Sequence, residues 1–182
     1  MSFFIVFLIG ELYSIPSNES FVIPEGTEVI ENREYFENNQ ITGTLIIPHT
    51  VRIIGHYAFC RCRKLTGTLT IPDSVEKIGD YAFSECTGFN GSLILSNSLS
   101  EININAFYGC NKFQGSLQIP NSVVKINKEA FASCNGFNGS LVIPDSVSII
   151  DEGAFKLCSG FRGSLNIPIS IINIYPFSFY SC

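Results

Sequence analysis

The sequence predicts a β-rich solenoid that forms one continuous domain, and three observations carry this prediction. A glycine returns every 24 residues with no insertion or deletion, at Gly43, Gly67, Gly91, Gly115, Gly139 and Gly163. Charged residues make up only 15% of the 182-residue chain, whereas Gly, Ser, Asn and Pro are plentiful, which favours short strands and tight turns over long helices. The apolar fraction of 46% is ample for a packed core. A constant period of this length is typical of coils that bury their apolar sides only against their neighbours.

Each coil is numbered here from its glycine, and its apolar positions predict two short extended runs followed by turns. The third and fifth positions are apolar in every coil, so both side chains point inward from a first strand. Proline at the sixth position ends this strand because it has no N–H to donate. The ninth and twelfth positions supply the core from a second extended run, and the seventeenth and twenty-third supply aromatic layers. In coil 67–90 these core residues are Leu69, Ile71, Val75, Ile78, Phe83 and Phe89.

Small residues mark the turns between these runs. Gly, Asn or Asp at the thirteenth position and Gly at the twenty-second, as in Gly79 and Gly88, predict left-handed backbone at both points. The alanine that precedes the aromatic residue, as in Ala82, leaves room for close packing of the backbone.

The periodicity divides the chain into an N-terminal segment and one repeat domain. Residues 1–18 form an apolar segment whose longest apolar run, residues 3–9, is too short to span a bilayer. Two interpretations of this segment stay open: a signal peptide, or an apolar strand that caps the core. Residues 19–182 form the repeat domain, with a divergent first coil 19–42, full coils 43–66, 67–90, 91–114, 115–138 and 139–162, and a truncated last coil 163–182. Because solenoid ends normally need caps, we expect end-to-end self-association or the continuation of a longer repeat array.

The pattern L-x-I-P-x-x-V-x-x-I-x-x-x-A-F-x-x-C-x-x-F, which runs from Leu69 to Phe89, resembles the BspA-like, or treponemal-type, leucine-rich repeats. The resemblance covers residues 19–182, although Ser96 replaces the proline of one coil and residues 175–178 depart from the pattern in the last. It implies a curved, right-handed leucine-rich repeat superhelix with short parallel strands and short turn or 3-10 segments. It also implies a surface protein of anaerobic bacteria or parasitic protists, associated with adhesion to extracellular-matrix proteins and to other cells. None of the shared motif is catalytic.

Six of the seven cysteines occupy the twentieth position of successive coils: Cys62, Cys86, Cys110, Cys134, Cys158 and Cys182. They form a structural column with neighbours about 4.8 Å apart, the strand spacing, and their side chains run parallel instead of turning toward each other. We therefore expect buried free thiols, and neither disulfides nor a metal site. Cys60 lies outside the column and is expected to be the more exposed thiol.

Charged residues alternate in sign along several columns. The net charge of -5 gives no broad attraction to nucleic acid, so none is expected as a partner. A basic cluster at Arg52, Arg61, Arg63 and Lys64 has two interpretations, a polyanion site or a pairing device between coils. The register of the repeats favours ion pairing between coils, because Arg52 and Arg61 each lie between glutamates of the adjacent coils. Only Arg63 and Lys64 lack such partners.

Catalytic constellations are not visible in the sequence. His49 and His56 have no Ser or Cys nucleophile at a recognisable motif spacing and lie at different positions of the coil. Asp73 and Asp145 are three coils apart, roughly 14 Å by the strand spacing, which argues against a carboxylate dyad. The chain is therefore predicted to be non-enzymatic, with no catalytic residue and no cofactor.

The fourth position of the coil faces outward and varies, so it supplies the candidate protein-binding face: Ile46, Thr70, Ile94, Gln118, Val142 and Asn166. A purely structural interpretation stays open, since β-branched residues also favour strands. We expect a non-catalytic module that binds a protein partner, in its most concrete form a cell-surface or secreted adhesion protein that binds host or extracellular-matrix proteins. The alternative is a cytoplasmic interaction scaffold. Glycosylation at the N-x-S sequons of Asn90 or Asn138 would favour secretion.

Overall fold

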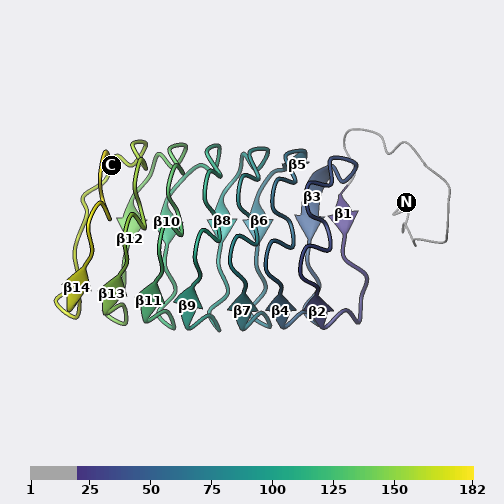
Figure 1. Cartoon of the computed structure of the whole chain (residues 1–182), viewed down its shortest axis with the longest axis horizontal. Coiled ribbons are helices and arrows are strands. Elements are labelled where there is room, and N and C mark those ends of the chain that lie inside the picture. Colours follow the sequence, from purple (N-terminus) through teal and green to yellow (C-terminus); the bar gives the residue numbers. More distant parts are fainter. Residues whose placement is uncertain (1–19) are drawn as a thin grey trace.

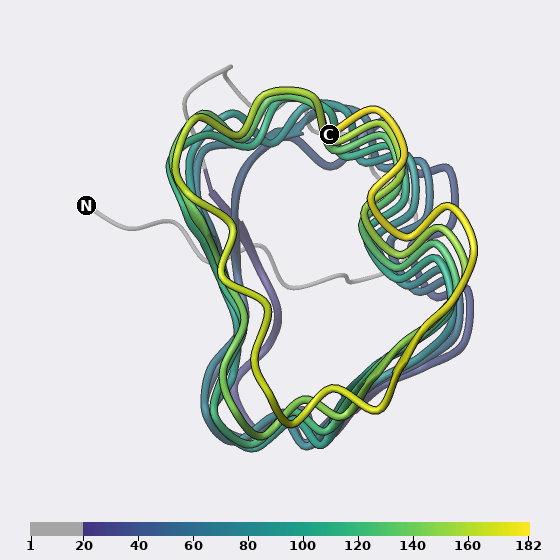
Figure 2. The ribbon, with the colours of Figure 1, turned by 90° about the vertical axis from the view of Figure 1, so that its left-hand side faces the viewer.

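The computed structural model describes residues 20–182, which form a solenoid of stacked coils (Figure 1). Viewed along the long axis, successive coils superimpose closely and enclose a continuous core (Figure 2). Within residues 20–182 every strand pair is parallel and no helix forms. The predicted β-rich solenoid with 24-residue coils, short parallel strands and turns is confirmed.

Short strands at the third and fourth positions form the first side of the solenoid. These strands are β1 (Phe21–Val22), β3 (Gly43–Ile46), β6 (Leu69–Thr70), β8 (Leu93–Ile94), β10 (Leu117–Gln118) and β12 (Leu141–Val142). Residues exactly one coil apart pair, as in Leu69↔Leu93, so paired side chains face the same side. Along each strand an inward residue is followed by an outward one, as in Leu69 and Thr70. A further strand, β5 (Leu65–Thr66), pairs with the start of β3.

A second side is built from strands at the eleventh and twelfth positions. They are β2 (Val29–Ile30), β4 (Ile53–Ile54), β7 (Lys77–Ile78), β9 (Glu101–Ile102), β11 (Lys125–Ile126), β13 (Ile149–Ile150) and β14 (Asn173–Ile174). These strands line the lower edge of Figure 1 and again pair one coil apart, as in Ile126↔Ile150. The second residue of each strand is an isoleucine, which is buried in every one of these strands except β14.

Tight turns form the third side. Their amides donate alternately to a carbonyl of the same turn and to a carbonyl of the next coil. The amide of Ala82 donates to the carbonyl of Gly79 within the same turn, at 3.2 Å, whereas the amide of Phe83 donates to Ala106 in the next coil, at 2.8 Å. The same alternation recurs along the solenoid, so nearly every polar backbone group of the turns is paired without a strand or a helix.

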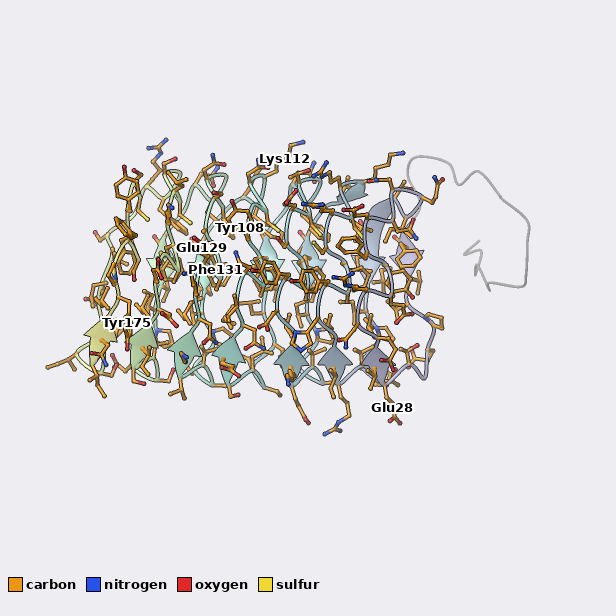
Figure 3. All side chains as sticks on the ribbon, viewed as in Figure 1. Glu28, Tyr108, Lys112, Glu129, Phe131 and Tyr175 are labelled. Carbon is orange, nitrogen blue, oxygen red and sulfur yellow. The ribbon has the colours of Figure 1, made fainter. Side chains whose placement is uncertain are left out.

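Aromatic rings stack along the whole core, as the sequence predicts. Rings of the seventeenth position lie 5.0–5.6 Å apart between centroids, from Tyr35 through Phe59, Phe83, Phe107, Phe131 and Phe155 to Phe179. A second stack joins Phe89, Phe113, Phe137 and Phe161. Phe131 lies in the middle of the solenoid (Figure 3) and is fully buried. Replacing such a phenylalanine by alanine is expected to lower the free energy of unfolding by about 3 to 5 kcal/mol.

The left-handed backbone lies elsewhere than predicted. Positive φ angles occur at the fifteenth and nineteenth positions of every described coil, as at Tyr81 (φ 59) and Glu85 (φ 56), and not at Gly79 or Gly88. Those two glycines are needed for a different reason: a Cβ on Gly88 would collide with the carbonyl oxygen of Leu65, and one on Gly79 would collide with backbone of the preceding coil. The prediction at the thirteenth and twenty-second positions was therefore wrong in conformation, although small residues are required there.

Apolar side chains of the last coil are exposed, in contrast to their equivalents. Leu165 and Ile174 occupy positions that are buried in the interior coils but are 43% and 48% exposed here, because no coil among residues 20–182 packs on their outer side. Phe177 and Tyr180 lie in the same layer and are also exposed.

Candidate functional site

The predicted binding residues lie on one outward face. We call Ile46, Thr70, Ile94, Gln118, Val142 and Asn166 the binding strip, and the structure exposes all six. Ile46 is 45% exposed, Ile94 51% and Val142 41%. The ladder aligns the strip residues in neighbouring coils, since Thr70 pairs with Ile94 and Gln118 with Val142.

Part of the backbone of the binding strip is engaged in hydrogen bonds between coils. The carbonyls of Ile46, Ile94 and Val142 accept amides of the preceding coil, as in the bond from the Ile71 amide to the Ile94 carbonyl at 2.9 Å. The neighbouring hydroxyls are also engaged: the Ser116 hydroxyl oxygen accepts the Ser140 amide at 3.0 Å. No strip residue is titratable, so contacts made by the strip alone are expected to depend little on pH or salt.

The cysteine column is a hydrogen-bonded core element. Each thiol donates to the carbonyl oxygen of the seventeenth residue in the preceding coil at 2.8–3.0 Å, from Cys62 with Tyr35 to Cys182 with Phe155. Burial raises the pKa of Cys62 and Cys134 to about 12. Because the thiolate is the nucleophile and the metal ligand, these thiols are poor candidates for either role at neutral pH.

Cys60 is buried, which contradicts the prediction that it is the more exposed thiol. Only 5% of its surface is accessible, and burial raises its pKa. The exposed thiol of the chain is Cys182.

The basic cluster forms ion pairs between coils. Arg61 bridges Glu37 at 2.6 Å and Glu85 at 3.3 Å, and Arg52 pairs with Glu76. Arg63 also binds Glu85, at 2.6 Å, so the expectation that it lacks an acidic partner was wrong. The sequence missed this pair because Arg63 and Glu85 occupy different positions of their coils.

The histidines and sequon asparagines take part in local contacts. His49 is a surface residue beside Glu25 at 3.6 Å, and His56 lies 3.4 Å from Asp80. Asn90 accepts the amide of Gly67 at 2.8 Å through its side-chain oxygen. Among residues 20–182, no group of three His, Cys, Asp or Glu side chains is arranged to hold a metal ion.

A second surface feature, which the sequence did not predict, lies over the turns. A groove of about 360 Å³ runs across several coils between aromatic and charged side chains, and Tyr57, Tyr81, Tyr108 and Glu129 are among its lining residues. Figure 3 labels Tyr108 and Glu129, which come from neighbouring coils. The signal in the sequence was the change from Cys60 and Ser84 to the bulky Tyr108 at the eighteenth position.

No helix in the described part of the chain has the length and apolar character needed to cross a bilayer.

Comparison with solved structures shows related solenoids. A leucine rich cell surface protein from Faecalibacterium prausnitzii is 28% identical, with a TM-score of 0.56, and the match covers 82% of this chain but 34% of that protein. The chain thus spans about a third of the length of that relative. A leucine rich repeat protein from T. pallidum is 23% identical with a TM-score of 0.60, over 80% of this chain and 79% of that one, and supports the fold. A search among curated proteins found no match.

The family comparison covers the whole repeat domain. The model of the BspA type leucine rich repeat region matches residues 11–138 and 135–182, in six copies. The 24-residue period, the paired short strands and the aromatic stack described above agree with this match. The chain therefore belongs to the BspA-type leucine-rich repeat family.

Proposed function

We propose that this chain is a non-catalytic protein-binding module of a cell-surface or secreted adhesion protein, and that its binding strip contacts a host or extracellular-matrix protein. The supporting observation is the exposure of branched apolar side chains, among them Ile46, Ile94 and Val142, on a regular parallel ladder. Apolar surface that stays exposed to solvent is typical of a protein-binding interface. The cell-surface description of the Faecalibacterium relative agrees with this location.

The strip suits a broad contact more than a single deep pocket. Burying the exposed half of one Val or Ile side chain against a partner contributes on the order of 1 kcal/mol to the binding free energy. Several coils must therefore be covered by the same partner before binding becomes strong, and the strip offers one residue in each of six coils. Thr70 and Gln118 lie between the apolar residues and supply hydrogen-bonding groups that fix the register of the partner.

Two measurements test the proposal. Purified chain is passed over immobilised collagen, laminin and fibronectin, and antibody against the chain is applied to intact and to permeabilised source cells. Saturable binding to a matrix protein together with labelling of intact cells supports adhesion. Labelling only after permeabilisation, with no matrix binding, would instead favour the cytoplasmic scaffold.

A further inference from the structure

The groove over the turns is bounded on one side by the fifteenth position of five successive coils. We call this set, Arg33, Tyr57, Tyr81, Asn105 and Glu129, the axial column. The amide of each member donates to the next coil, as from Tyr57 to Asp80 and from Tyr81 to Ile104, both at 2.9 Å. The column is therefore fixed at the coil spacing of about 4.8 Å, and its ends lie roughly 19 Å apart.

The floor of the groove is open over two coils and closed at both ends. At the eighteenth position the small side chains of Cys60 and Ser84 form the floor and are 5% and 4% exposed. The same position carries Phe36 in the preceding coil and Tyr108 in the following coil, and both line the groove. A side chain from outside can thus enter only above Cys60 and Ser84.

The axial column carries opposite charges at its two ends. Among residues 20–182, Arg33 makes no ion pair, and its guanidinium lies 5.3 Å and 5.1 Å from the ring centroids of Phe36 and Tyr57. Glu129 also makes no ion pair with a described residue, and accepts one hydrogen bond, from Asn105 at 3.3 Å. A cation and an anion at the ends of the groove are therefore both available to a ligand.

The opposite wall is already neutralised. Glu85 accepts hydrogen bonds from Arg61 at 3.3 Å and from Arg63 at 2.6 Å, and Arg61 also binds Glu37. These charges satisfy one another, so the ends of the axial column determine which charges a ligand must carry.

The middle of the column is aromatic. Tyr57 and Tyr81 stack with centroids 4.7 Å apart and planes 2° from parallel. Both have the positive φ, 57° and 59°, that the fifteenth position shows in every described coil, so the repeat itself fixes their backbone. Tyr and Arg are also the residue types that dominate binding energy at protein interfaces.

We propose that this groove binds one extended segment of a protein partner, which lies along the solenoid axis with an acidic side chain at Arg33, an apolar side chain above Cys60 and Ser84, and a basic side chain at Glu129. The inference rests on the proposed protein-binding function and adds a second contact with a defined ligand chemistry. An extended chain rises about 3.3 Å per residue, so acidic and basic residues six apart match the length of the column. A guanidinium binds a carboxylate through two parallel hydrogen bonds, which favours an acidic group at the Arg33 end.

Three synthetic peptides test the charge order. Each has seven residues, blocked ends, Phe in the middle and Ser as spacers, and the terminal pair is Glu and Lys, Glu and Glu, or Lys and Lys. The unmodified chain is expected to bind the mixed peptide roughly fivefold more tightly than either like-charged peptide, measured by fluorescence anisotropy at low salt. Arg33→Glu should make the Lys and Lys peptide the best ligand, and Glu129→Lys should do the same for the Glu and Glu peptide. Since each variant gains one ligand as it loses another, unfolding cannot produce this result.

A matched pair of variants tests the floor. Ser84→Tyr places in the groove the side chain that Tyr108 carries at the same position, and it should abolish binding of the mixed peptide. Ala132→Tyr makes the same kind of change at the eighteenth position beyond Tyr108, outside the groove lining, and should leave the affinity unchanged.

The outcomes separate this inference from the adhesive role. Equal affinity for the three peptides, or an unchanged ranking in Arg33→Glu and Glu129→Lys, overturns the groove assignment. Saturable binding of maltoheptaose that Ser84→Tyr removes, without peptide selectivity, would overturn it in favour of a glycan. Matrix binding that persists in these variants while peptide selectivity is absent leaves the adhesive role standing, and peptide selectivity without matrix binding contradicts that role alone.

Discussion

The Cys86 thiol donates a hydrogen bond of 2.9 Å to the carbonyl oxygen of Phe59 in the preceding coil. The carbonyl belongs to the backbone that carries the aromatic stack, so the thiol joins the two most regular columns of the core. Equivalent bonds from Cys110 and Cys134 are 3.0 Å long. The cysteines thus act as small buried donors that join one coil to the next.

The first prediction concerns thiol access. Cys182 is exposed, whereas the other six cysteines are buried, so a single thiol of the native chain should react quickly with Ellman's reagent at about pH 8. All seven should react in guanidinium chloride. Cys182→Ser removes the fast phase; a fast phase of two or more thiols in the native chain contradicts the described burial.

The second prediction follows from the raised thiol pKa values. Burial raises the pKa of Cys62 and Cys134 from 9.0 to about 12, and raises those of Cys86 and Cys110 well above 9.0. In the unfolded chain these thiols have their ordinary pKa. Their contribution to the free energy of unfolding is therefore complete below about pH 9 and is lost as the pH rises from there toward about pH 12. Each thiol should lower the free energy of unfolding by up to about 1.4 kcal/mol per pH unit in this range. Guanidinium titrations at about pH 8 and about pH 10.5 check this, and equal unfolding free energies at both values would refute it.

Much of the core could be predicted because each apolar position repeats. Leu69, Ile78 and Phe83 have equivalents in every full coil, and only stacked coils bury all of them together. The left-handed positions could not be predicted this way. Tyr81 and Glu85 carry no glycine signal, and their positive φ follows from amides that must reach Ile104 and Tyr108 in the next coil.

The third prediction uses this backbone conformation. Ser133 has φ 62°, where a Cβ is unfavourable, so Ser133→Gly should be more stable than Ser133→Ala by about 1 kcal/mol. Ser100 is an exposed residue outside the left-handed positions, and there the order should reverse, with Ala more stable than Gly. Thermal and guanidinium unfolding of the four variants compares the two sites. The same order at both sites would contradict the assigned conformation.

The fourth prediction concerns the inter-coil ion pairs. Arg61→Glu places a third acidic group between Glu37 and Glu85, so it should lower the melting temperature at low salt and lower it less at high salt. Lys64→Glu is the control, because Lys64 makes no ion pair with any residue in 20–182. An unchanged melting curve for Arg61→Glu, or an equal change for Lys64→Glu, would show that the pairs do not stabilise the register of the coils.

The candidate surfaces were only partly visible in the sequence. The outward position of Ile94 follows from alternation along its strand, so the binding strip could be located from the repeat alone. The groove depends on differences between neighbouring coils. Cys60, Ser84 and Tyr108 share one position, and it is their unequal size that opens the floor between closed ends. A consensus of the repeat averages over the coils, so it does not show these differences in side-chain size.

We expect the varied outward residues of the first strand column, and not the repeated residues, to bind the partner. Ile94→Lys and Ile53→Lys provide the most direct test, because both replace an exposed isoleucine on an outward strand position, 51% and 39% exposed, on different sides of the solenoid. Affinity for the matrix protein identified by the binding panel is measured for each variant by surface plasmon resonance. We expect Ile94→Lys to weaken binding about tenfold and Ile53→Lys to leave it unchanged. Equal affinities of the two variants would contradict it.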